Sequence, residues 1–261
     1  MTLKEKATRF LNDKASDLFE MLRTTTLTKD VELGFVEGFQ FEKAGYHPVC
    51  GMTKVCFVFD EFVIKTSFDY KTMYYTVYDG VEKFEKLEKK VIELEDACET
   101  EYLAYKKAVE EGLSDFFFET DYLGCGIYVQ ERCEESLQDA RWSRGLTSAT
   151  REYDDYEREC AIDALVNSIP EEEAEMDVDE YTTVGDSVRY VDSYLKEDCV
   201  TNFIQTYDRG PMVKLARFLF NYDITDIHDA NVGFDKVGRL RIFDFSGFCS
   251  STRELVKGVK V

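Results

Sequence analysis

The strongest constraint on the fold is a pair of short apolar segments near the C-terminal end of the sequence. Residues 232–234 and 240–242 alternate apolar and other side chains, and residues 235–238 between them have the composition of a turn. This pattern predicts a hairpin of two paired strands. Asn231 and Asp244 then lie at neighbouring ends of the hairpin, so two oxygen-bearing side chains are held close together.

The chemistry of these two side chains favours a magnesium ion. A carboxylate and an amide carbonyl suit Mg²⁺, which keeps several waters and takes further ligands from nucleotide phosphates. Asp226 lies five residues before Asn231 on the same predicted loop. Its carboxylate is placed to accept the proton of an attacking hydroxyl group.

A second pattern predicts a long amphipathic helix over residues 82–111. One stripe of it is formed by residues spaced three and four apart, namely Leu87, Val91, Leu94, Cys98, Glu101, Tyr105 and Ala108. Glu101 is the only charged member of the stripe. Because burial of a lone carboxylate costs several kcal/mol, Glu101 either has a cationic partner or lies at the rim of the buried face.

Other segments predict strands and two further helices. Residues 55–59 and 62–65, separated by Asp60 and Glu61, have the pattern of a tight hairpin that ends at Lys65. A strand is expected at residues 127–129, after a turn containing Gly124 and Gly126. Helices are expected over residues 3–23 and 212–221, the first of them docked on the body of the protein through its apolar face.

Taken in this order, the segments resemble the protein-kinase-like superfamily. Its catalytic loop has the pattern D-x-x-x-x-N, followed about a dozen residues later by the Asp of D-F-G. Here Asp226 and Asn231 keep the first spacing, and Asp244 begins the sequence D-F-S-G thirteen residues after Asn231. The sequence of residues 226–231 is more similar to the D-L-H-x-x-N motif of small-molecule and atypical kinases than to the H-R-D motif of ordinary protein kinases.

The resemblance implies ATP and Mg²⁺ as cofactors and a role for each matching residue. Residues 62–65 resemble the V-A-I-K strand, which implies that Lys65 contacts the α- and β-phosphates and pairs with Glu101. Asp226 would be the catalytic Asp, and Asn231 and Asp244 the metal ligands. Residues 127–133 resemble the hinge, where backbone groups at Glu131 and Cys133 would contact adenine.

The expected phosphate loop departs from the family pattern. Residues 45–51 do not spell G-x-G-x-x-G, so the resemblance assigns only Gly51 to the phosphates. An ordinary connection between strands is an equal alternative for this segment. His228 lies beside the expected base but receives no chemical role.

The resemblance also implies a fold class, α+β. We expect a bilobal protein-kinase-like fold with a small antiparallel-sheet N-lobe and a truncated, mainly helical C-lobe. The expected parts are an N-terminal helix (1–30), the N-lobe and hinge (31–133), an acidic insertion (134–204) and the catalytic loop, metal-binding hairpin and tail (205–261). Only 17 residues follow Asp244, which leaves no room for an activation segment. This layout is similar to that of phage-encoded serine/threonine protein kinases.

The net charge limits the partners. Residues 134–198 hold 20 acidic and 6 basic residues, so −14 of the net charge of −21 falls there. Such a chain repels nucleic acid and anionic membranes, and an acidic rim favours basic protein substrates. The alternative to a phosphotransferase is a catalytically inactive kinase-like or acidic DNA-mimic protein that binds and inhibits a DNA-binding partner.

Composition further indicates a cytoplasmic protein, or one of the host cytoplasm if a phage encodes it. No window approaches the roughly 18–20 apolar residues of a membrane span. The eight cysteines include no C-x-x-C pair, so reduced thiols are expected rather than a zinc site.

Overall fold

The computed structural model describes residues 1–78, 85–143, 199, 202–203, 206–207, 209–245 and 250–258. The chain divides into two compact units. The first comprises Met1–Tyr102 and Thr120–Arg132, and the second comprises Leu103–Glu119 and Cys133–Val261. Both contain helices and antiparallel sheets, so the expected α+β class is confirmed. The predicted acidic insertion (134–204) lies largely outside the described residues.

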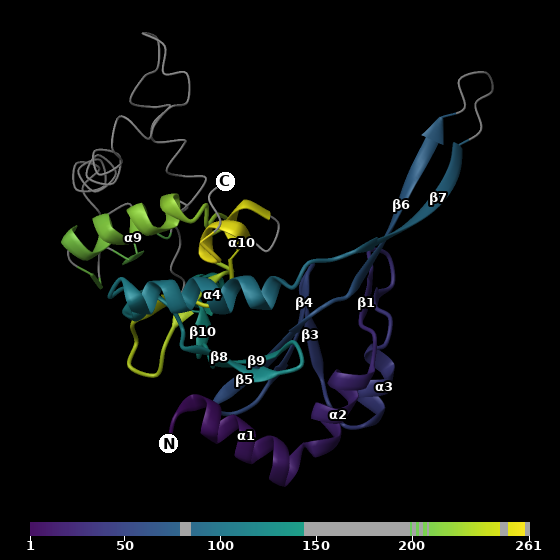
Figure 1. The fold of residues 1–261 in the computed structure, drawn as a ribbon, viewed down its shortest axis with the longest axis horizontal. Coiled ribbons are helices and arrows are strands. Elements are labelled where there is room, and N and C mark those ends of the chain that lie inside the picture. Colours follow the sequence, from purple (N-terminus) through teal and green to yellow (C-terminus); the bar gives the residue numbers. More distant parts are fainter. Residues whose placement is uncertain are drawn as a thin grey trace. The chain divides into compact units, whose positions relative to one another are not determined.

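A five-stranded antiparallel sheet organises the first unit (Figure 1). Its order is β3 (Pro48–Cys50), β4 (Lys54–Val58), β5 (Phe62–Ser67), β9 (Ile127–Glu131), β8 (Thr120–Gly124). The predicted hairpin is confirmed, because Val58 pairs with Val63 and the backbone NH of Phe59 donates to the carbonyl of Phe62 at 2.9 Å. The turn between β8 and β9 has positive φ at Gly124, Cys125 and Gly126, as a tight glycine-containing turn requires.

Two helices cover one face of this sheet. The predicted helix over residues 3–23 is α1 (Leu3–Lys14) followed by α2 (Ser16–Thr24), because the backbone breaks at Ala15, where φ is −146°. Their apolar stripes are buried together with side chains of the sheet, among them Ala7, Leu11, Leu18, Val55, Phe57, Ile64, Ile127 and Val129. A short helix, α3 (Gly38–Lys43), was not predicted. Gly45, at φ +89°, follows its end.

A second sheet in this unit corrects a prediction. It has the order β2 (Gly34–Phe35), β1 (Thr28–Asp30), β6 (Tyr70–Tyr78), β7 (Glu85–Glu93), with β1 parallel to β6. Figure 1 shows β6 and β7 as a long ribbon of two strands. The helix expected over residues 82–111 is therefore wrong for residues 85–93, and only α4 (Ala97–Glu110) is helical. Residues 85–93 form a strand because they pair along nine residues with β6, which is rich in the strand-favouring residues Tyr and Thr.

The second unit builds its own core around α9 (Arg209–Asn221). The predicted helix 212–221 is confirmed within it, and the side chains expected on its apolar face are buried, namely Met212, Leu215, Ala216 and Leu219. The predicted hairpin is β11 (Val232–Phe234) and β12 (Leu240–Ile242), with Val232 opposite Ile242. Completing the described elements are η1 (Ser114–Phe116), β10 (Glu135–Ser136), α5 (Leu137–Ser143) and α10 (Ser250–Val256).

Two further observations concern membrane-spanning helices and disulfide bonds. In the part of the chain that the structure describes, no helix combines the length and apolar character needed to cross a membrane. None of the six cysteines in these same residues forms a disulfide.

Candidate functional site

The centre of the first unit holds a buried carboxylate between two lysines. The Oε2 atom of Glu101, on α4, lies 3.3 Å from Nζ of Lys65, on β5, and the Oε1 atom pairs with Nζ of Lys54, on β4. All three side chains are nearly inaccessible, with exposed fractions of 6% for Lys54, 5% for Lys65 and 3% for Glu101. Of the two alternatives for Glu101, the structure therefore shows the cationic partner, and it brings Lys65 and Glu101 together as predicted.

Lys54 was not predicted, although the register of the β4–β5 hairpin places it. Cys56 lies directly opposite Lys65, and Lys54 is two residues before Cys56. Because side chains alternate along a strand, Lys54 and Lys65 project from the same face as diagonal neighbours about 7 Å apart. The two-residue turn at Asp60 and Glu61 was predicted from the sequence and sets this register. The position of Lys54 beside Lys65 could therefore have been predicted as well.

A small hydrogen-bond cluster attaches α4 to the strand that carries Lys65. The hydroxyl of Ser67, on β5, donates to the Oδ1 atom of Asp96 at 2.7 Å and accepts from the backbone NH of Cys98 at 3.0 Å. Asp96 precedes α4 and also accepts from the NH of Glu99 at 3.0 Å, as an N-cap residue does. The hydroxyl of Tyr128, on β9, donates to its other oxygen at 3.1 Å. These contacts fix where α4 begins. They therefore also fix the position of Glu101, which lies about one turn into the helix.

Burial raises the pKa of two groups beside this cluster. Burial, followed by the nearby charge of Glu101, raises the pKa of the Cys98 thiol. Burial, with Asp96 as the next cause, also raises the pKa of Tyr128. Both groups therefore stay protonated at neutral pH, and Tyr128 remains a hydrogen-bond donor to Asp96.

In the second unit, the loop after α9 carries Asp226 in a strained conformation. Its φ is +68°, a left-handed value that residues other than glycine seldom adopt and that is common at functional sites. Its side chain is exposed. The Nε2 atom of His228 lies 3.6 Å from Asp226 Oδ1, and Nδ1 of His228 accepts from the NH of Ala230 at 3.2 Å. Nδ1 of His228 also lies 3.6 Å from Oδ1 of Asp229, so the imidazole has a carboxylate near each of its ring nitrogens.

Asn231 connects this loop to the segment that carries Asp244. The side-chain Nδ2 atom of Asn231 donates to the backbone carbonyl of Asp226 at 2.8 Å. The backbone carbonyl of Asn231 accepts from the backbone NH groups of Phe243 at 3.0 Å and Asp244 at 3.2 Å. The structure thus places Asp226, Asn231 and Asp244 in one hydrogen-bonded arrangement of loop and hairpin. Asp244 is half-buried there.

The side chains of Asn231 and Asp244 carry oxygen atoms of the kind that Mg²⁺ binds. Because Nδ2 of Asn231 donates to Asp226, its Oδ1 atom is the one directed away from that bond and suited to a cation. The described residues include no group of three or more His, Cys, Asp and Glu side chains that could hold a metal by themselves. An ion held by Asn231 and Asp244 would complete its ligands with phosphate oxygens and water, as Mg²⁺ commonly does.

The remaining predicted residues lie on the following elements. Gly51 is in the turn between β3 and β4, and its NH donates to the carbonyl of Lys54 at 3.0 Å. Glu131 ends β9 opposite Phe62 and belongs to the first unit. Cys133 belongs to the second unit, where it lies against β11, and burial raises the pKa of its thiol to about 12.

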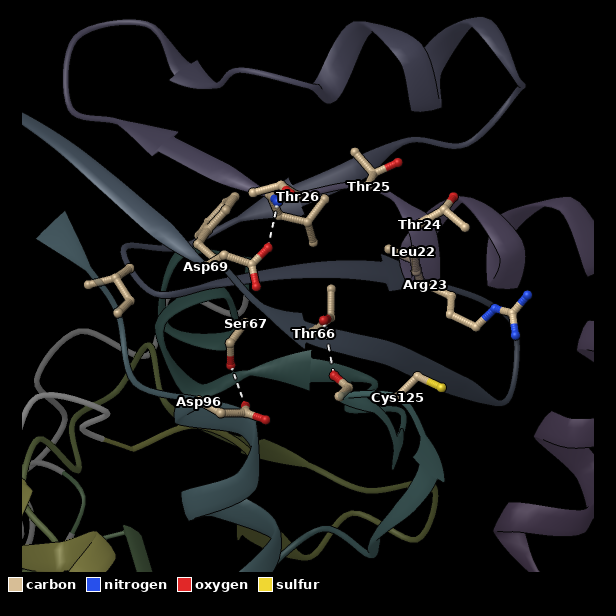
Figure 2. A pocket seen from close by; sticks show the side chains of 14 residues that line it. Leu22, Arg23, Thr24, Thr25, Thr26, Thr66, Ser67, Asp69, Asp96 and Cys125 are labelled. Carbon is tan, nitrogen blue, oxygen red and sulfur yellow. Dashed lines mark hydrogen bonds between the residues drawn. The ribbon is translucent and has the colours of Figure 1, made fainter. Parts of the chain in front are cut away.

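A polar cavity of about 290 Å³ lies elsewhere in the first unit. Figure 2 shows Arg23, Thr24, Asp69, Asp96 and Cys125 around it, and none of the predicted site residues lines it. Thr66 and Ser67 of β5 also line this cavity. Because Ser67 and Asp96 are among the lining residues, the cavity borders the hydrogen bonds that attach α4 to β5.

Comparison with known proteins adds no relative. No protein-family model matches the chain, and neither the curated proteins nor the solved structures include a significant match.

Proposed function

We propose that the protein is an ATP- and Mg²⁺-dependent phosphotransferase that modifies serine or threonine residues of a protein. The observation that carries the proposal is the buried pair formed by Lys65 and Glu101. In protein kinases a lysine on the third strand of the small lobe pairs with a glutamate on the next helix. Lys65 is on the third strand of its sheet in chain order, and Glu101 is on α4.

The energetics of this pair support a functional role. Burial of charged groups costs several kcal/mol for each ion, and a well-packed apolar cluster of similar volume is often at least as stable. A buried cluster of three charged side chains is therefore a poor way to stabilise a sheet. Such clusters are common where a site must bind or orient charge.

The proposal assigns the other groups that phosphoryl transfer needs to residues of the second unit. In the proposed reaction Asp226 accepts the proton of the acceptor hydroxyl, whose oxygen attacks the γ-phosphorus while the bond to the leaving ADP oxygen breaks. Asn231 and Asp244 would hold the metal ion, which when bound would neutralise charge on the phosphates. Lys65 contacts the α- and β-phosphates, and Glu101 orients Lys65. Catalysis then comes from placement and charge rather than covalent chemistry.

The proposal includes the bilobal protein-kinase-like fold, with the five-stranded sheet in the small lobe and α9 in a truncated, mainly helical lobe. The organisation is that of a compact, phage-type kinase acting in the cytoplasm. Gly51, Glu131 and Cys133 are assigned to the nucleotide. The acidity of residues 134–198 favours a basic protein substrate, because opposite charge speeds encounter.

Incubation of the purified protein with MgATP tests the proposal directly. We expect intact-protein mass spectrometry to show phosphoryl groups on the protein itself or on an added basic protein, with the label on serine or threonine. Asp244→Ala should abolish the transfer, and Asp60→Ala, at an exposed turn position, should leave it unchanged. Equal transfer by the wild type and Asp244→Ala would show that the assignment is wrong.

A thermal-shift measurement separates the enzyme from the alternative, a kinase-like or acidic DNA-mimic binder. A ligand at 100 times its Kd adds about 2.7 kcal/mol, which for a chain of this size corresponds to a rise in Tm of about 5–10 °C. We expect such a rise with millimolar MgATP and a smaller one for Asp244→Ala. The absence of any shift in the wild type would favour the binder.

A further inference from the structure

We propose that Lys54 is a positioning residue for phosphate transfer, which acts through Glu101 on Lys65. This inference rests on the proposed phosphotransferase function and adds a residue that the kinase-like pattern does not assign. The geometry points to it because Glu101 binds a different lysine at each of its two carboxylate oxygens.

The two contacts hold the carboxylate differently from a single ion pair. A carboxylate bound at one oxygen can rotate about that contact, whereas contacts at both oxygens fix its plane. Lys54 and Lys65 come from adjacent strands in fixed register, so their Nζ atoms approach Glu101 from defined directions. Lys54 therefore sets where Glu101 lies, and Glu101 sets where the ammonium group of Lys65 lies.

Burial makes the contribution of Lys54 large. The pairing between Lys54 and Oε1 of Glu101 is almost wholly inaccessible to water, which cannot replace a lost ammonium group without opening the cluster. When Lys54 is removed, Glu101 is expected to turn toward Lys65 and draw its Nζ atom away from the phosphates. A displacement of about 1 Å in a catalytic group can cost about 100-fold in rate.

The effect should appear mainly in kcat. We expect Lys54→Met to lower kcat about 10–100-fold and to raise KM for ATP less than about 3-fold, because Lys54 acts on the placement of Lys65 and does not itself contact ATP. Lys54→Arg retains a cation for Glu101 and should keep kcat within about 3-fold of the wild type. If Lys54→Met fails to fold, the comparison of Lys54→Arg with the wild type still tests the proposal, since a loss greater than about 3-fold would contradict it.

A double-mutant cycle with Glu101→Gln distinguishes positioning from an independent role. If Lys54 acts through Glu101, then Lys54→Met in the Glu101→Gln background should lower kcat less than about 2-fold further. Additive losses in the cycle would overturn the proposal and indicate a direct phosphate contact. A fall in Tm without a change in kcat of the folded protein would also overturn it, because it would show a purely structural role.

The same series separates failure of this inference from failure of the proposed function. Transfer by the wild type, its loss in Lys65→Met and full activity in Lys54→Met would refute the role of Lys54 alone. A wild type that binds no MgATP and transfers no phosphate would refute the proposed function, and the role of Lys54 with it.

Discussion

At Ser67 a single hydroxyl group makes two hydrogen bonds that attach α4 to β5. It donates to Asp96 and accepts from the NH of Cys98, and both bonds are partly buried. Lys65 lies two residues earlier on the same face of β5. The position of Glu101 relative to Lys65 therefore depends on a serine that carries no charge and belongs to no motif.

Removal of this hydroxyl tests its importance. We expect Ser67→Ala to lower the free energy of unfolding by about 1–2 kcal/mol, because the NH of Cys98 loses its partner and Oδ1 of Asp96 loses one of its donors while it keeps the NH of Glu99. Ser67→Thr keeps the hydroxyl in a strand that tolerates β-branched residues, so it is the matched control. Urea unfolding of the two variants measures the difference. Equal stability of the Ala and Thr variants would contradict the role assigned to the hydroxyl.

Asp235 is the acidic centre of the β11–β12 turn. Its buried carboxylate accepts from the NH groups of Val237 and Arg239, and from Nε of Arg239 at 3.0 Å, and Nε of Arg241 lies 3.2 Å away. Burial raises the pKa of Asp235, but the hydrogen bonds and the arginine charge outweigh burial, so its pKa lies below the ordinary value. The folded state therefore favours the ionised form.

The sign of the pH dependence follows from that lowered pKa. A carboxyl group whose pKa is lower in the folded state stabilises the fold above its unfolded pKa of about 3.9, and this contribution is lost as the pH falls through the folded pKa. We expect Asp235→Asn to cost about 1–3 kcal/mol at pH 7 and progressively less below about pH 4. Urea unfolding across pH 3–7 measures this, with Asp60→Asn as the exposed control. A deficit that stays constant with pH would show that the charge of Asp235 is unimportant.

Among the elements, β11 approaches β10 so closely that one position requires glycine. A Cβ atom on Gly233 would lie 2.2 Å from Sγ of Cys133 and 2.6 Å from the carbonyl oxygen of Glu135. The second contact is with backbone, which cannot move away as the end of a side chain can. The hairpin that carries Asn231 therefore depends on a residue without a side chain.

The substitution Gly233→Ala should accordingly separate the two strands. We expect a loss of about 1–3 kcal/mol or more in the free energy of unfolding. Adding Cys133→Ala should recover only part of it, because the carbonyl of Glu135 stays in place. Gly210→Ala, in α9 and with open space at its Cβ position, should be neutral or up to about 1 kcal/mol stabilising. A Gly233→Ala variant as stable as Gly210→Ala would contradict the close approach.

Elements whose own residues show a clear strand or helix pattern were predictable, and an element whose conformation depends on pairing with its neighbour was not. The hairpins 55–65 and 232–242 and the helix 212–221 follow from local periodicity and turn residues. The segment 85–93 has the Glu and Lys content of a helix, yet it is β7, since pairing with β6 outweighs a preference of a few tenths of a kcal/mol per residue.

The residues of the candidate site differ in the same way. Lys65, Glu101, Asp226, Asn231 and Asp244 were predicted because each lies at a recognisable spacing. The contacts that position Glu101 come from residues on other elements, namely Lys54, Ser67, Asp96 and Tyr128. Only strand register, applied across the sheet, would have exposed Lys54 in advance.

At the scale of the whole molecule, charge repulsion is the remaining force to weigh. The net charge is −21, and ion pairs of low burial such as Lys6 with Glu61 offset little of it, since each contributes about 0–1 kcal/mol. A compact chain of one dominant sign repels itself more than an expanded chain does. Added salt screens this repulsion, because the Debye length falls from about 30 Å at 0.01 M to about 10 Å at 0.1 M.

We therefore expect salt to stabilise the fold. Raising NaCl from 0.01 to 0.3 M should increase the free energy of unfolding by about 1 kcal/mol or more, equivalent to a rise in Tm of at least about 2–4 °C. The buried pairs of Glu101 with Lys54 and Lys65 are screened far less than the surface, so they do not reverse the sign. KCl at the same ionic strength should act equally, which separates screening from binding of a particular ion. A Tm that falls with salt would show that attractive surface pairs, rather than the excess of carboxylates, dominate the electrostatics of this chain.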